Sequence, residues 1–99
     1  MKEDLLKIIN HYGIKSQQRK LQEEVFELQE AIINAENNRL IGISRKPSEL
    51  AIEHIAEEIA DCYVMLNQFQ YYYGIEDKDI NDIMISKIDR QLNRIKENK

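Results

Sequence analysis

The chain has 99 residues, of which 42% are hydrophobic and 32% charged, and its formal net charge is −4. This length predicts one domain over residues 1–99, with a small core that a homo-oligomer would enlarge. The acidic balance argues against general binding of nucleic acid or of an anionic membrane. A single cysteine excludes an internal disulfide and a cysteine-based zinc site. Without a signal sequence or a long apolar run, the expected location is the cytoplasm.

The predicted regular structure is entirely helical, so the expected fold is an all-α, four-helix bundle. Gly13 ends the first helix, and Ser16 caps the second after a short connection. A polar connection over residues 37–48 follows, and the third helix begins behind Pro47 with Ser48 as its cap. The predicted helices span residues 1–12, 17–37, 49–73 and 77–95, and the tail beyond them is expected to fray.

The segments Lys20–Ile32 and His54–Leu66 form a quasi-repeat with an offset of 34 residues. Each segment carries an apolar stripe at helical spacing, which we expect to be buried. Each also carries the same acidic pattern, EExxE in the first and EExxD in the second. The stripes consist of Leu21, Val25, Leu28 and Ile32 in the first segment, and of Ile55, Ile59, Cys62 and Leu66 in the second.

A helical wheel divides the acids of the two segments into an inner and an outer set. With Val25 and Ile59 each set at 0° and about 100° per residue, the stripes fall within about 60° to one side, and Glu24 and Glu58 lie at about −100°. Glu27 and Asp61 lie at about −160°, and both pairs therefore border the stripe. Two helices packed through these stripes would bring four carboxylates together, which predicts a site for a divalent cation. The outer acids are Glu23 and Glu57.

The ligand chemistry of such a site favours a hard cation. Mg²⁺ takes about six oxygen ligands at ~2.0–2.1 Å, and Mn²⁺ accepts the same donors. A di-iron bundle is the nearest alternative, since it also collects glutamates from several helices. That site uses Glu-x-x-His pairs, which neither segment contains, although His54 lies one turn before Glu58.

The two acidic segments resemble the EExxE…ExxD signature of MazG-like, all-α nucleoside triphosphate pyrophosphohydrolases. The matching sequences are EEVFE at Glu23–Glu27 and EEIAD at Glu57–Asp61, and the resemblance extends over about residues 5–94. It implies hydrolysis of a nucleoside triphosphate between the α- and β-phosphates, with Mg²⁺ as cofactor. The expected products are a nucleoside monophosphate and pyrophosphate.

The resemblance also implies a role for each candidate site residue. Metal ligands would be Glu24, Glu27, Glu58 and Asp61. Glu23 and Glu57 would support the ligands or position the attacking water. Lys87 resembles a family lysine that contacts phosphate. Gln91 stands where the dCTP-type branch has a substrate-binding asparagine, and Met65 where it has an aromatic residue, so base and sugar selection stay open. Further candidates for substrate binding are Lys20, Arg90 and Arg94.

The remaining predictions concern the oligomeric state and an alternative function, both of which would use the apolar helix faces. Family members of this size form dimers or tetramers, which implies a homodimer or homotetramer here. The alternative function is a non-enzymatic helical module that oligomerises or binds a partner helix, in which the acids are solvent-facing and have no metal affinity. The apolar stripe expected on the fourth helix consists of Ile80, Ile83, Met84, Ile88, Leu92 and Ile95.

Overall fold

The computed structural model describes residues 1–40 and 47–98, apart from the side chains of residues 38–40. All regular structure in these two ranges is α-helical, which confirms the all-α prediction. No helix in the described part of the chain has the length and apolarity needed to cross a membrane. The four helices are α1 (Lys2–Tyr12), α2 (Ile14–Leu40), α3 (Glu49–Tyr72) and α4 (Asp77–Glu97).

The connection between α1 and α2 is a single residue, shorter than predicted. Gly13 has a φ of 92°, a conformation that favours glycine, and its carbonyl accepts a hydrogen bond from the Gln17 amide at 3.1 Å. Because the chain turns at Gly13, α2 begins at Ile14, and the prediction that Ser16 caps this helix is wrong. At its other end α2 reaches Leu40, while residues 41–46 of the predicted connection lie outside the described residues.

The start of α3 and the elbow after it follow from local sequence. The hydroxyl of Ser48 accepts a hydrogen bond from the Ala51 amide at 3.1 Å, which confirms the predicted cap. Beyond α3, Gly74 takes a φ of 70° and lets the chain turn sharply. The fourth helix then begins at Asp77, as the acidic residues there predict.

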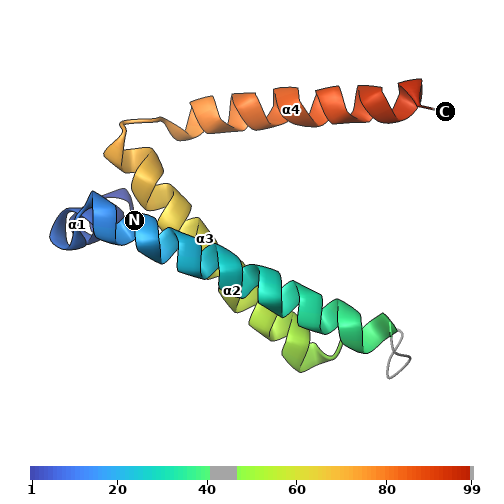
Figure 1. Cartoon of the computed structure of the whole chain (residues 1–99). Coiled ribbons are helices and arrows are strands. Elements are labelled where there is room, and N and C mark those ends of the chain that lie inside the picture. The colour runs from blue at the N-terminus through green and yellow to red at the C-terminus, as the bar shows by residue number, and fades with distance from the viewer. Residues whose placement is uncertain (41–46, 99) are drawn as a thin grey trace.

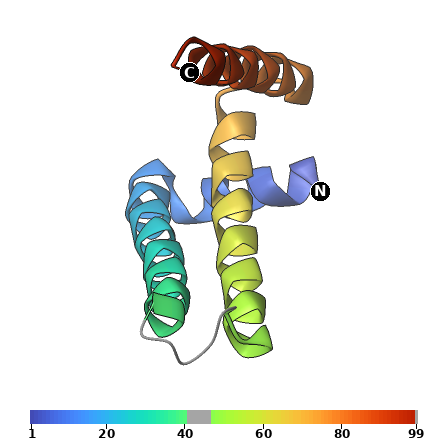
Figure 2. The ribbon, with the colours of Figure 1, turned by 90° about the vertical axis from the view of Figure 1, so that its right-hand side faces the viewer.

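Three of the helices pack together and the fourth extends from them. Helices α2 and α3 run antiparallel side by side, and α1 crosses them near the start of α2 (Figure 2). Helix α4 leaves the end of α3 at an angle (Figure 1). Among the described residues it packs against no other helix, and only its first residue, Asp77, is hydrogen-bonded to the end of α3. One chain therefore forms a three-helix unit with a projecting arm rather than the predicted four-helix bundle.

The core of the three-helix unit is small and differs from the predicted stripes. Val25, Ile32, Ile59 and Leu66 are 36–50% exposed, so the expectation that they are buried is wrong for the single chain. Helices α2 and α3 meet instead through the sides that carry Glu24 and Glu58, which are rotated away from the predicted stripes. Small residues on α2 allow this close approach, and the apolar arc of each helix is wider than one neighbour can cover. The buried apolar residues are Leu5, Ile9, Ala31, Ala35, Cys62 and Met65.

Candidate metal centre

Three of the four predicted metal ligands lie together between α2 and α3. Glu24, Glu27 and Glu58 each offer a carboxylate oxygen, and these three oxygens lie within 4.8 Å of one another. Glu24 and Glu27 share a face of α2 because they are three residues apart. The antiparallel packing then brings Glu58 of α3 opposite them, as the quasi-repeat predicts.

Two of these carboxylates are buried and incompletely paired. The exposed fractions of Glu24 and Glu58 are 6% and 8%, so both lie inside the helix pair rather than at its edge. One oxygen of Glu24 is 3.0 Å from the Lys20 ammonium, and one oxygen of Glu58 is 4.0 Å from His54 Nε2. The other oxygen of each, Oε2, is buried without a hydrogen-bond partner. Buried polar atoms are nearly always satisfied in native proteins, and two such oxygens at one place are suited to bind a cation.

The burial and crowding of the carboxylates raise the pKa values of two groups in the centre, Glu58 and Cys62. Burial raises the pKa of the Glu58 carboxyl, and repulsion from Glu27 and Asp61 adds to this, whereas His54 opposes it. Burial also raises the pKa of the Cys62 thiol, with further contributions from the neighbouring carboxylates. A bound cation would relieve the repulsion that holds the pKa of Glu58 up.

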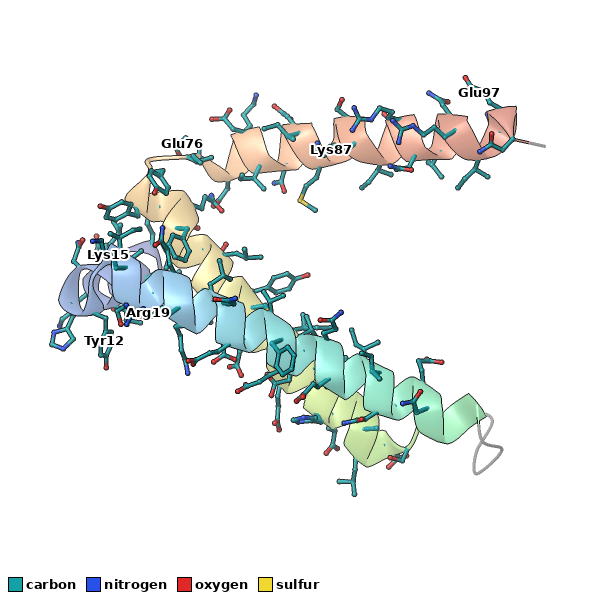
Figure 3. All side chains as sticks on the ribbon, in the orientation of Figure 1. Tyr12, Lys15, Arg19, Glu76, Lys87 and Glu97 are labelled. Carbon is teal, nitrogen blue, oxygen red and sulfur yellow. The ribbon has the colours of Figure 1, made fainter. Side chains whose placement is uncertain are left out.

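A cleft of about 600 Å³ opens beside the carboxylates between α1, α2 and α3. Asp61, the fourth predicted ligand, lines this cleft together with Glu23 and Glu24. The labelled Tyr12 side chain lies on the side of the molecule away from α4 (Figure 3). Besides these acids, the cleft is lined by apolar, basic and amide side chains. Its other lining residues are Ile8, Tyr12, Ser16, Gln17, Arg19, Lys20, Val64, Met65 and Gln68.

Two buried glutamines, Gln17 and Gln68, line the cleft beside the predicted site residues. Gln68 is 1% exposed, and its Oε1 accepts a hydrogen bond from Gln17 Nε2 at 2.8 Å. Its own Nε2 donates only weakly, to the sulfur of Met65 at 3.7 Å. A sequence signal for the pair exists, since Gln17 precedes Glu24 by seven residues and Gln68 follows Asp61 by seven. Seven residues are about two helical turns, so each glutamine shares a helix face with an acid.

The remaining predicted residues are divided between the cleft and the projecting arm. Lys20 is the predicted basic residue that the structure brings to the carboxylates, and its hydrogen bond to Glu24 raises the pKa of its ammonium. Glu57 is exposed and lines neither the cleft nor the carboxylate cluster. Four candidates lie exposed on α4, which the chain does not bring to the acids: Lys87, Arg90, Gln91 and Arg94.

The donors present fit Mg²⁺ or Mn²⁺ better than iron. All three clustered ligands are carboxylates, which suit hard divalent cations. His54 is exposed and lies at 4.0 Å from Glu58, outside the cluster. Comparisons with protein-family models, with curated proteins and with solved structures found no match to this chain, so the assignment of the centre depends on its own residues and geometry.

Proposed function

We propose that the protein is a Mg²⁺-dependent nucleoside triphosphate pyrophosphohydrolase, with Mn²⁺ as a possible substitute. The observation that carries this proposal is the pair of buried, unpartnered carboxylate oxygens on Glu24 and Glu58 beside a cleft of about 600 Å³. A volume of this order suits a small-molecule ligand. The EExxE…EExxD pattern supports the choice of reaction, because of its resemblance to the MazG-like enzymes.

Glu24, Glu27 and Glu58 would hold the metal, with Asp61 completing the set from the rim of the cleft. When bound, the metal supplies positive charge against the phosphates and lowers the pKa of a coordinated water. Glu23 lines the cleft and would orient the attacking water and accept its proton. The attack falls on the α-phosphorus, and the bond to the β-phosphate oxygen breaks, so that pyrophosphate leaves.

The rest of the cleft would bind the substrate. Lys20 and Arg19 provide positive charge near the acids for the phosphates. Tyr12 and Val64 offer aromatic and apolar surface to the nucleoside. The glutamine pair presents amide groups that match the hydrogen-bonding edge of a base. In one chain α4 holds Lys87, Arg90, Gln91 and Arg94 apart from the cleft, so their predicted substrate contacts would require another copy whose α4 reaches the acidic side of α2–α3.

The decisive assay incubates the protein with Mg²⁺ and a panel of canonical and modified nucleoside and deoxynucleoside triphosphates, and separates pyrophosphate from orthophosphate. We expect a monophosphate and pyrophosphate from at least one of them, and no turnover by Glu58→Gln. Glu53→Gln is the matched control, since Glu53 is an exposed acid on the same helix. Orthophosphate as the sole inorganic product would refute α–β cleavage, and normal turnover by Glu58→Gln would refute the ligand assignment.

The alternative, a non-enzymatic helical module, is favoured by a different observation, the exposed apolar side chains along α4. It predicts no metal-dependent change in stability and no hydrolysis of any triphosphate in the panel. The two functions are therefore separated by the same assay together with a metal titration.

A further inference from the structure

Two large apolar surfaces remain uncovered in the single chain. The first, which we call the arm stripe, lies on α4 and has side chains 53–61% exposed. Its members fall within an arc of about 100° on a helical wheel, and four of them follow a 3-4-3 spacing typical of helix–helix seams. The arm stripe consists of Met84, Ile85, Ile88, Leu92 and Ile95.

The second surface, which we call the back face, lies on the α2–α3 pair. Its side chains are 36–63% exposed. On each helix they lie about 80–140° from the buried face, in the rotation sense opposite to Glu27 and Asp61. Because the helices are antiparallel, this rotation brings both sets to one side of the pair, opposite the acids. The back face consists of Val25, Ile32, Ile59, Tyr63 and Leu66.

The elbow between α3 and α4 keeps the arm stripe away from the back face of its own chain. Asp77 Oδ1 accepts hydrogen bonds from Gln70 Nε2 at 2.7 Å and from the Tyr71 hydroxyl at 3.0 Å. Gln70 Nε2 also donates to the Ile75 carbonyl at 3.1 Å. These bonds brace the turn at Gly74, and α4 projects at an angle from α3 rather than folding back onto α2 and α3 (Figure 1).

We propose that the arm stripe of each chain packs onto the back face of a second copy, forming a two-fold dimer by reciprocal exchange of α4. Each chain carries both complementary surfaces, so one symmetric contact covers all of them. Together the ten half-exposed side chains present on the order of 1,000 Å² per chain, comparable to the ~800 Å² per partner that a stable interface buries. Packing α4 against α4 alone would leave the back face in water. The proposal does not depend on the metal centre, which lies on the opposite side of α2–α3.

Light scattering and a pair of complementary variants test this exchange. The wild-type protein at micromolar concentration should have twice the 11.8 kDa mass of one chain. Ile88→Asp in the arm stripe and Leu66→Asp in the back face should each yield a monomer. Their helix content, from circular dichroism, should stay close to wild type, since both residues are already half exposed. Asn93→Asp, an exposed change elsewhere on α4, is the matched control and should remain a dimer.

Mixing the two monomeric variants provides the discriminating result. A mixed pair retains one intact contact, between the arm stripe of the Leu66→Asp chain and the back face of the Ile88→Asp chain. We therefore expect the mixture to recover dimers, with an affinity at least tenfold below wild type. A dimer held by α4–α4 packing would not be rescued, because every mixed pair would contain one damaged arm. Absence of rescue, or a monomeric wild-type protein, would overturn the proposal.

Discussion

The substitution Glu24→Gln should stabilise the metal-free protein and abolish its response to metal. Glu24 is 6% exposed, its Oε2 has no partner, and its carboxylate lies with those of Glu27 and Glu58. A glutamine keeps the shape, removes one negative charge, and places an amide donor beside the remaining carboxylates. A hydrogen bond to a charged group contributes about 1.5–3 kcal/mol.

The same substitution loses the ion pair with Lys20, at 3.0 Å, whose lysine partner is 53% exposed. Because the Lys20 ammonium is half exposed and screened by water, we take the contribution of this pair as about 0–1 kcal/mol. The net effect on the metal-free protein is therefore a gain of about 1 kcal/mol in the free energy of unfolding. For a domain of this size that corresponds to a rise of about 4–8 °C in Tm.

Metal binding should raise the Tm of the wild-type protein by more than the Glu24→Gln substitution does, and this rise should require the Glu24 carboxylate. A ligand at 100 times its Kd stabilises the folded state by about 2.7 kcal/mol. Wild-type Tm should then rise by roughly 10–20 °C on addition of Mg²⁺ or Mn²⁺. The Glu24→Gln protein should show little change at the same concentration.

Differential scanning calorimetry with and without metal measures both effects, and Glu53→Gln serves as a control that should behave like wild type. Two results would refute the reasoning. One is a Glu24→Gln protein that keeps most of the metal-induced rise in Tm. The other is a metal-free Glu24→Gln protein less stable than wild type, which would mean that the carboxylate is stabilising as it stands.

Three further predictions concern pH, the cleft and the helix cap. The pKa of Glu58 is raised in the fold, so between the ordinary glutamate pKa and the raised one the folded metal-free protein holds a proton that the unfolded chain has released. Calorimetry should therefore show the stability of the metal-free protein falling as pH rises through this window, while the metal-induced rise in Tm grows. A stability that does not change with pH in this window would contradict the assignment. Gln68→Ala leaves Gln17 without its 2.8 Å partner, so chemical denaturation should show a loss of about 1–3 kcal/mol and steady-state assays a raised KM, whereas an unchanged KM would remove the pair from the substrate site. Ser48→Ala removes the acceptor for the Ala51 amide and should lower the free energy of unfolding by about 1 kcal/mol, and an unchanged Tm would mean that the cap bond contributes nothing in solution.

Much of the candidate site was predictable because helical periodicity is a local property. The spacing of Glu24 and Glu27 places both on one face of a helix whatever surrounds it. The matching phase of Glu58 then implies that two packed helices bring the acids together, as the structure shows. The same local logic predicts the cap at Ser48 and the start of α4.

Which side of each helix becomes the interface was not predictable from the stripe alone. The apolar arcs of α2 and α3 are wide, and the predicted stripes include Val25 and Ile59. In the fold the helices meet about 80° further round, where Ala31 and Ala35 permit close approach and Glu24 and Glu58 become buried. The choice depends on the shapes of both helices at once, which no single segment encodes.

The place of α4 is likewise a tertiary property. Its sequence predicts an amphipathic helix, and the structure confirms the helix at Asp77–Glu97. The direction of this helix depends on the elbow, where Gly74 turns and Gln70 and Tyr71 hold Asp77. That turn separates Lys87 from the acids within one chain. The acidic motif and the helices thus follow from local pattern. The burial of the acids follows from long-range packing, because it depends on contacts between residues distant in sequence, whereas the exposure of the arm follows from the three-dimensional geometry of the elbow, which helical periodicity does not encode.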